Sequence, residues 1–312
     1  MDRPTTSLPA RPLAFAKLCG AGNDFIALDG EAALAAPGVE AIRRLCDRRY
    51  GVGADGLMLL RRVAGVDGDD AAFEVDFYNA DGSGGMLCGN GARCALERAR
   101  ILGWIEPGRS VGFRFAGRDY RGASVGEGLA RFELDPRVRL DGPLELRVGA
   151  ETIRGRYADV GSVHFVAGVG SILGYDGRPA YRGVDEVPMD AFGRAVRRHE
   201  AFAPLGVNAS VWEADGGRLR VRTFERGVEG ETLACGTGSV SCALSAWLDG
   251  RVEPPVRVGT RGGDELVVDF EPEPAVSPAP APPDCRPAAA PRLRSLSLSG
   301  PAYQAFEGSV RL

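Results

Sequence analysis

Two cysteines stand in the same local sequence and could act as an acid–base pair. Cys88 begins Cys-Gly-Asn-Gly and Cys235 begins Cys-Gly-Thr-Gly, each before apolar residues at helical spacing. A thiol has an unperturbed pKa of about 8.5, and a helix N-terminus should lower it through its free N–H groups and dipole. Two such thiols could remove a proton from one face of a carbon and deliver another to the opposite face. This chemistry predicts a cofactor-independent isomerase that inverts an amino-acid α-carbon.

The glycines after each cysteine have a separate role in this interpretation. Glycine lets the backbone approach a ligand closely and point N–H groups at it, so both motifs could bind the reacting carboxylate. The same N–H groups would stabilise the negative charge that develops on deprotonation. One such motif is weak evidence, because a glycine-rich turn before a helix is common and free cysteine is often simply buried. Two copies in the same frame are stronger evidence.

The elements around the two cysteines repeat. Phe73, Val75 and Phe77 alternate with polar residues, as in a half-buried strand, and the chain then passes through a loop to Cys88 and a helix that stops at Gly103. A strand at 219–224 similarly leads through a loop to Cys235, followed by Val240, Ala243, Leu244, Trp247 and Leu248 on one helix face. This repeat predicts two similar α+β domains that face each other, each with one cysteine at a helix start.

The remaining pattern completes this organisation. Strands are expected within 13–30, at 57–60, throughout 111–148 and within 293–312, and a helix at 38–49 with Val39, Ile42, Leu45 and Cys46 on its buried face. Residues 1–12 are expected to be a loose tail and 64–70 a turn. The predicted domains are 13–135 with a returning C-terminal strand at 293–312, then 136–270. Residues 271–291 contain eight prolines, so 271–292 is expected to be a flexible Pro/Ala-rich insertion.

Composition excludes several other classes. Lys17 is the only lysine and lacks a phosphate-binding loop, which argues against a pyridoxal-phosphate enzyme, and two histidines cannot build a multi-histidine metal centre. We therefore expect no cofactor and no metal. The net charge of −4, without a basic cluster, argues against nucleic acid. Seven cysteines without a signal peptide or membrane span suggest free thiols in the cytoplasm and no membrane partner.

Six ordered motifs and a closing segment make the chain resemble the diaminopimelate epimerase family. The similarity runs from about Phe15 to the last residue, apart from 271–291. The motifs are GAGNDF at 20–25, CDRRYGVGADG at 46–56, NADGS at 79–83, CGNGARC at 88–94, ERGV at 225–228 and ETLACGTG at 231–238, with GPA and FEG near the end.

The resemblance implies a complete function. Members convert LL-2,6-diaminopimelate to the meso form through a thiol pair, without a cofactor, in the biosynthesis of lysine and peptidoglycan precursors. They are often homodimers. The resemblance also implies a mixed sheet wrapped around a central helix in each domain, with the active site in the cleft between the domains.

By position, the resemblance assigns Cys88 and Cys235 as the acid–base pair. The backbone N–H groups of Gly89, Asn90, Gly236 and Thr237 would hold the reacting carboxylate. The distal end of the substrate, which carries a carboxylate and an ammonium, would be held by Asn23, Asn79, Asn208, Glu225 and Arg226. A guanidinium suits that carboxylate and a glutamate suits that ammonium. His164, with Glu225, would help to set a cysteine pKa.

The sequence departs from the family pattern at two places. Ser162 and Val163 replace the common Asn-Pro before His164, so one substrate contact is expected to differ. Glu229 is an extra residue in the segment between Glu225 and Cys235, and it should form a local bulge. Other polar and thiol residues have structural interpretations: Asp24 and Asp55 as turn and cap residues, and Cys94 and Cys242 as small packed side chains.

Three other functions are compatible with parts of the sequence. Proline racemases, hydroxyproline epimerases and some histidine-racemising relatives use the same thiol logic, although a proline-type site has no need of Glu225 and Arg226. A hydrolase with Cys88 and His164 as a dyad would leave the second motif unexplained. A non-catalytic binding protein would not need both cysteine motifs intact.

Overall fold

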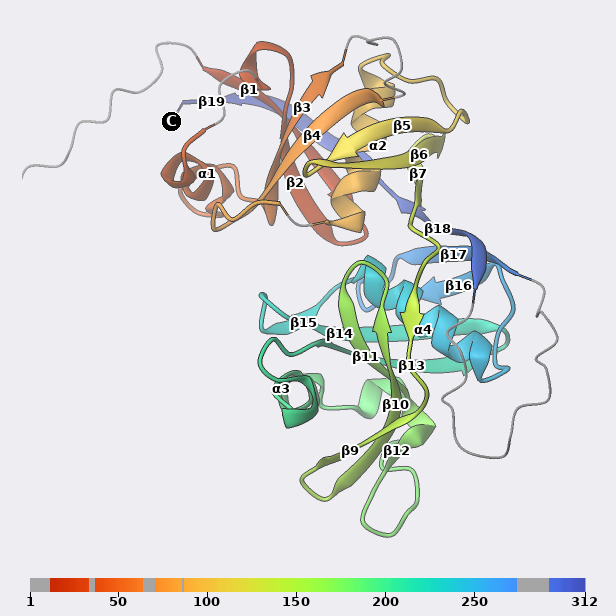
Figure 1. Cartoon of the computed structure of the whole chain (residues 1–312). Coiled ribbons are helices and arrows are strands. Elements are labelled where there is room, and N and C mark those ends of the chain that lie inside the picture. Colours follow the sequence, from red (N-terminus) through yellow and green to blue (C-terminus); the bar gives the residue numbers. More distant parts are fainter. Residues whose placement is uncertain (1–11, 34–36, 64–70, 86, 274–291, 312) are drawn as a thin grey trace, which may run out of the picture. The chain divides into compact units, whose positions relative to one another are not determined.

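The computed structural model describes residues 12–33, 37–63, 71–85, 87–273 and 292–311, and the chain divides into two compact units (Figure 1). The first unit comprises residues 1–132 and 301–312, and the second comprises 133–300. Within the ranges described, no helix is both long enough and apolar enough to cross a membrane.

The first unit is a mixed sheet with one long helix and one short helix. Its strands pair in the order β19-β1-β2-β3-β4-β5-β6, with β2–β3 and β4–β5 parallel and the other neighbours antiparallel. The elements are β1 (Leu13–Gly20), β2 (Asn23–Leu28), η1 (Gly30–Ala33), α1 (Val39–Cys46), β3 (Gly56–Arg62), β4 (Ala71–Asn79), α2 (Gly89–Ile101), β5 (Val111–Phe115), β6 (Arg118–Gly126), β7 (Leu129–Glu133) and β19 (Tyr303–Val310).

The second unit has the same plan with additions. Its main sheet runs β10-β11-β13-β14-β16-β17-β18, with β11–β13 and β14–β16 parallel and the other neighbours antiparallel; β8, β9 and β12 also pair with β10, and β15 with β14. The elements are β8 (Arg139–Leu140), β9 (Leu144–Val148), β10 (Glu151–Asp159), β11 (Val163–Gly168), η2 (Val169–Ser171), β12 (Ile172–Leu173), η3 (Val184–Glu186), α3 (Met189–Arg197), η4 (Glu200–Phe202), β13 (Asn208–Asp215), β14 (Arg218–Glu225), β15 (Gly230–Thr232), α4 (Gly236–Leu248), β16 (Val256–Gly259), β17 (Glu265–Pro272) and β18 (Leu293–Pro301).

The predicted internal repeat is confirmed by these pairings. Starting from β1 in the first unit and β10 in the second, successive neighbours alternate antiparallel and parallel in the same way through β6 and β17. In each unit a long helix contacts strands from across the sheet: α2 contacts β1, β2, β3, β4, β6 and β19, and α4 contacts β10, β11, β13, β14, β16 and β17 (Figure 1). The α+β class with a mixed sheet around a central helix is therefore confirmed.

A short helix closes the other face of each sheet. In the first unit, Ile42 and Leu45 of α1 pack with Ile26 and Leu57 of the sheet. In the second unit, Phe192 of α3 belongs to a larger buried cluster that also includes strands β11, β13 and β14. Burial of these apolar faces provides the main favourable free energy of each unit.

Several boundaries and faces differ from the sequence prediction. The predicted returning strand at 293–312 is two strands, and 293–300 lies in the second unit because β18 pairs with β17, while β19 pairs with β1. The helix predicted at 38–49 ends at Cys46, and Val39 and Leu248 are exposed, since each stands at a helix end beyond the buried face.

Three predicted segments fall wholly or mostly outside the described residues. Of the predicted insertion, Glu271 and Pro272 complete β17, because their backbone continues the pairing with β18. Residues 274–291 lie outside the described ranges, as do residues 1–11 of the tail predicted at 1–12 and the predicted turn at 64–70.

Candidate active site

Cys88 is the N-cap of α2, as predicted. Its backbone is extended, with φ −117° and ψ 105°, and its side chain is partly exposed. The N–H of Gly91 donates a hydrogen bond to Cys88 Sγ at 3.3 Å. The sulfur therefore lies at a helix N-terminus, where main-chain N–H groups and the helix dipole favour negative charge.

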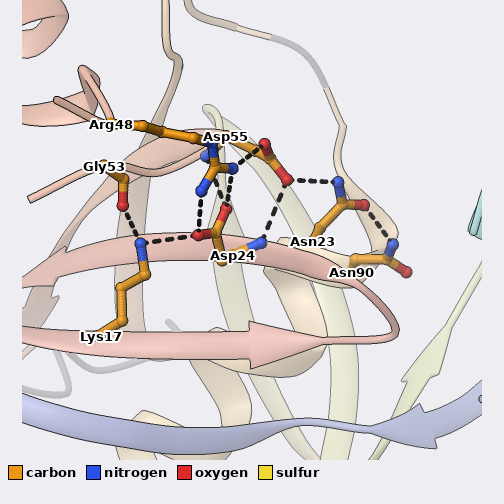
Figure 2. A network of polar contacts seen from close by, with 7 residues as sticks. All are labelled: Lys17, Asn23, Asp24, Arg48, Gly53, Asp55 and Asn90. Atoms are coloured by element: carbon orange, nitrogen blue, oxygen red, sulfur yellow. Dashed lines mark hydrogen bonds and ion pairs between the residues drawn. The ribbon is translucent and has the colours of Figure 1, made fainter. Parts of the chain in front are cut away.

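Asn23 and Asn90, predicted for two different parts of the substrate, are direct neighbours. Asn90 Nδ2 donates to Asn23 Oδ1 at 2.6 Å, and Asn23 Nδ2 donates to Asp55 Oδ2 at 2.9 Å (Figure 2). Asn23 begins β2, while Asn90 lies in the first turn of α2, two residues after Cys88. The turn between β1 and β2 thus places an amide beside the helix that carries the cysteine.

Sequence reasoning missed an ionic network behind these amides. Lys17 is buried, forms an ion pair of 2.8 Å with Asp24 and donates to the Gly53 carbonyl oxygen (Figure 2). Arg48 donates to both oxygens of Asp24, at 2.7 and 2.9 Å, and to Asp55 Oδ1 at 2.7 Å. Lys17 is the only lysine in the sequence, and this feature could have pointed to the network.

The network keeps its central carboxylate charged. Burial would raise the pKa of Asp24, but hydrogen bonds and charge from Arg48 and Lys17 outweigh it and hold that pKa well below the ordinary range. The interpretation of Asp24 and Asp55 as simple turn and cap residues was therefore incomplete, since both carboxylates form ion pairs with Arg48.

Asn79 ends β4 in a tight polar turn. Its Nδ2 donates to Ser83 Oγ at 2.9 Å, and its main-chain N–H donates to the Ser83 carbonyl oxygen at 2.8 Å. Asp81 in turn accepts from the main chain and hydroxyl of Ser83. These contacts are ordinary turn chemistry, and they hold the start of the loop that leads to Cys88.

Cys235 is the N-cap of α4 and is more buried than Cys88, with 8% of its surface exposed. Its Sγ lies 3.6 Å from Thr237 Oγ1. Burial raises the pKa of the Cys235 thiol well above its usual value, and the charge of Glu225 raises it further, against the Thr237 hydroxyl and the Gly238 N–H. The Gly238 N–H of the helix N-terminus does lower this pKa, as expected, but burial outweighs it and the pKa of Cys235 is raised overall.

His164 is fully buried behind Thr237. Its Nε2 lies 3.0 Å from Thr237 Oγ1, and its Nδ1 lies 3.3 Å from Ser210 Oγ. Burial, with a smaller contribution from the charge of Arg226, lowers the pKa of His164 to about 3. The ring is therefore neutral near pH 7 and contacts Cys235 through the Thr237 hydroxyl.

Asn208 uses most of its hydrogen-bonding capacity inside the second unit. Its Nδ2 donates to Ser162 Oγ at 3.0 Å and to the Val163 carbonyl oxygen at 2.9 Å. Its Oδ1 accepts from the main-chain N–H of Arg226 at 2.8 Å. Asn208 thus holds both Ser162 and the backbone that carries Arg226.

Glu225 and Arg226 lie at the end of β14. Glu225 is half-buried and accepts from Thr232 Oγ1 at 2.6 Å, whereas Arg226 is exposed. The extra residue Glu229 has a left-handed φ of 58°, and its N–H donates to the Glu225 carbonyl oxygen at 2.8 Å. The segment at 226–229 is a local turn, where the sequence predicts a bulge, and Glu229 is also paired with Arg197 at 3.2 Å.

The cysteines inside the two long helices, Cys94 in α2 and Cys242 in α4, are structural. Cys94 and Cys242 are fully buried, and burial raises the pKa of both thiols well above the ordinary value. Their interpretation as small packed side chains is confirmed.

The two units hold the first turn of their long helices in the same manner. In each, the residue two positions after the cysteine contacts a side chain at the start of the second sheet strand: Asn90 contacts Asn23, and Thr237 contacts His164. The repeat therefore includes the side-chain support of the cysteine turn, with different chemical groups.

Comparison with known proteins agrees with this arrangement. A family model for diaminopimelate epimerase matches residues 15–114 and 181–276. The diaminopimelate epimerase of Aquifex aeolicus is 34% identical over 309 residues, which cover 96% of this chain and 98% of that protein. That of Chlorobaculum tepidum is 33% identical over 298 residues, which cover 95% of this chain and all of that protein (100%).

Solved structures share the fold at low identity. A probable proline racemase from Agrobacterium radiobacter has a TM-score of 0.67 and 14% identity, over 96% of this chain and 92% of that one. A hydroxyproline epimerase from Agrobacterium vitis has a TM-score of 0.66 and 13% identity, over 99% and 93%. These structures support the fold, and the sequence matches give the family. The chain therefore belongs to the diaminopimelate epimerase family and is an amino-acid epimerase.

Proposed function

We propose that this epimerase converts LL-2,6-diaminopimelate to the meso isomer, with Cys88 and Cys235 as its acid and base. The observation that carries the proposal is the placement of both cysteines as N-caps at equivalent positions of the repeat. Inversion requires proton removal on one face of the α-carbon and delivery on the other, so two equivalent groups suit the reaction. The proposal requires that both sulfurs reach one α-carbon in the substrate-bound enzyme.

The helix N-termini supply the stabilisation that a cofactor would otherwise give. The main-chain N–H groups of Gly89, Asn90, Gly236 and Thr237 would bind the reacting carboxylate. Negative charge that spreads onto this carboxylate during deprotonation is favoured by such preorganised donors. The raised pKa of Cys235 supports its role as the protonated thiol at rest, which leaves Cys88 to act as the base in that state.

The distal end of the substrate would be bound by Asn23, Asn79, Asn208, Glu225 and Arg226. The exposed Arg226 guanidinium can bind a carboxylate as a fork, and the half-buried Glu225 can accept from an ammonium. Asn208 would act partly through the Arg226 backbone that it holds. A place in lysine and peptidoglycan-precursor biosynthesis follows from this substrate; a cytoplasmic location and a homodimer stay predictions.

The test is epimerisation in deuterated water. Under reductant, LL-diaminopimelate should become the meso isomer with deuterium at one α-carbon, as read by NMR and mass spectrometry. Cys88→Ala and Cys235→Ala should each abolish turnover, while Cys19→Ala, which removes a partly buried cysteine from β1, should not.

Three outcomes would contradict the proposal. Near-normal turnover of either cysteine variant would refute the thiol pair. Exchange on proline or hydroxyproline, but not on diaminopimelate, would retain the thiol pair and refute the substrate. An acyl-enzyme trapped on one cysteine would favour a hydrolase.

A further inference from the structure

Four side chains of the first unit form one continuous hydrogen-bonded row, here called the amide relay. Arg93 Nη2 donates to Asn90 Oδ1 at 2.7 Å, and Asn90 Nδ2 donates to Asn23 Oδ1 at 2.6 Å. Asn23 Nδ2 then donates to Asp55 Oδ2 at 2.9 Å. The last two contacts are drawn in Figure 2.

The ends of the amide relay allow only one order of donors and acceptors. A guanidinium can only donate hydrogen bonds, and a carboxylate can only accept them. An amide side chain can do both and could otherwise rotate by a half turn. Between Arg93 and Asp55, each amide must turn its oxygen toward Arg93 and its nitrogen toward Asp55, because the opposite order would set two donors or two acceptors face to face.

We propose that Arg93 and Asp55 are positioning residues that fix the Asn23 and Asn90 amides in one orientation for substrate recognition. The inference rests on the proposed function, in which Asn23 binds the distal end of the substrate and the main chain of Asn90 binds the reacting carboxylate; it adds a role for the Asn90 side chain. After the relay contacts, each amide still has one N–H and one oxygen lone pair to offer. With a fixed orientation, these groups can meet a carboxylate and an ammonium in one order only.

Burial strengthens the donor end of the relay. Arg93 is fully buried and Asn90 is 3% exposed, so water competes weakly for their contacts. Arg93 Nη1 also reaches the Gly89 carbonyl oxygen, at 3.4 Å, which ties the guanidinium to the turn that follows Cys88. The donor end is therefore part of the cysteine turn itself.

The acceptor end is fixed by the ionic network. Asp55 Oδ1 accepts from Arg48 at 2.7 Å, and Oδ2 also accepts from the main-chain N–H of Asp24 at 3.3 Å. Lys17 holds Asp24 from the buried side. Asp55 thus has a donor on each oxygen, which holds the carboxylate in place.

The first test replaces Asn23 by a carboxylate. In Asn23→Asp, two carboxylates meet within hydrogen-bonding distance and can share one proton only at low pH. The shared proton raises the folded-state pKa of this pair of carboxyl groups. The stability that depends on this proton is therefore present at low pH and is lost as pH rises. Asp24 and Arg48 also contact Asp55, and both keep their charges across this range, because the pKa of Asp24 is lowered and that of Arg48 is raised.

The expected result is a loss of stability with rising pH that wild type lacks. Between about pH 5 and pH 9, the midpoint of thermal unfolding of Asn23→Asp should fall relative to wild type, and KM for LL-diaminopimelate should rise about tenfold with a smaller change in kcat. The exchanged pair Asn23→Asp/Asp55→Asn should abolish this pH dependence, because the new amide can donate to the new carboxylate. Asp55→Asn alone is the control for the lost charge.

The second test concerns the donor end. Arg93→Lys keeps a donor-only group and should change KM by less than about threefold, while Arg93→Gln can donate or accept and should raise KM by about tenfold at similar kcat. If Arg93→Gln does not fold, the Asn23 series decides.

Several results would overturn the proposal. The unfolding midpoint of Asn23→Asp could depend on pH in the same way as that of wild type. The added pH dependence could persist in the exchanged pair Asn23→Asp/Asp55→Asn. The two Arg93 variants could have equal KM values for LL-diaminopimelate. Because the unfolding profiles need no substrate, they test the relay even if wild type fails to epimerise diaminopimelate, which would instead refute the proposed function.

Discussion

Gly91 and Gly238 occupy the same position of the two repeats, three residues after each cysteine, but their surroundings differ. A Cβ atom at Gly238 would lie 2.7 Å from Thr223 Oγ1 and 3.2 Å from Cys235 Cβ. A Cβ atom at Gly91 would have its nearest neighbours at 3.4 Å, an ordinary contact distance. Overpacking of a buried site costs about 1–3 kcal/mol, so Gly238→Ala should be destabilising by that amount. Gly91→Ala should be neutral or stabilising by up to about 1 kcal/mol, through helix propensity.

Thermal unfolding measures this difference directly. For a unit of this size, 1 kcal/mol shifts the midpoint by about 2–4 °C, so Gly238→Ala should lower it by about 2–12 °C while Gly91→Ala leaves it unchanged or raises it. Adding Thr223→Ala removes the nearest oxygen, so the double variant Thr223→Ala/Gly238→Ala should lose less stability than the two single losses together. Equal effects at the two glycines, or strict additivity in the double variant, would refute the packing argument.

Three further predictions concern the second unit and its thiol. Iodoacetamide at neutral pH should label Cys88 before Cys235, because Cys235 is more buried and has a raised pKa; peptide mass spectrometry giving equal rates would contradict this. Glu225→Gln should speed the labelling of Cys235, since it removes a charge that raises that pKa, and an unchanged rate would exclude this electrostatic effect. With a folded-state pKa of about 3, His164 should show no ring titration by NMR between about pH 5 and pH 8, and stability should fall as pH drops below about 6.5, where the unfolded chain binds the proton.

Most strands and the two long helices could be predicted from the sequence, because each has a recognisable local pattern of residues. Alternating apolar residues at Phe73, Val75 and Phe77 predict a strand that the structure contains, and glycines after the cysteines predict helix starts at 89 and 236. The internal repeat then predicts the duplicated domain, since two similar strings of elements must bury similar faces. The burial of Cys94 and Cys242 follows from their place on the apolar helix faces.

The parts that were missed depend on three-dimensional contacts that no local pattern records. The alternation of residues around Lys17 does not indicate that its ammonium lies buried against Asp24, or that Arg48 joins Asp24 to Asp55. The division between β18 and β19 depends on which sheet each strand joins, and one continuous strand pattern does not record that choice. The raised pKa of Cys235 likewise depends on burial, which motif spacing does not give.

The two cysteine turns share a backbone plan but differ in the groups behind them, and the proposed reaction needs such a difference. Cys235 is held as a neutral thiol by burial and by the charge of Glu225. A reversible epimerisation exchanges the roles of acid and base, so a large permanent pKa difference between the two thiols would slow turnover. If the substrate ammonium pairs with Glu225, it removes the carboxylate's effect on Cys235, and the pKa of that thiol falls only when substrate is bound. In the proposed mechanism, Glu225 therefore both binds the distal end and adjusts the acidity of Cys235 to the presence of its substrate.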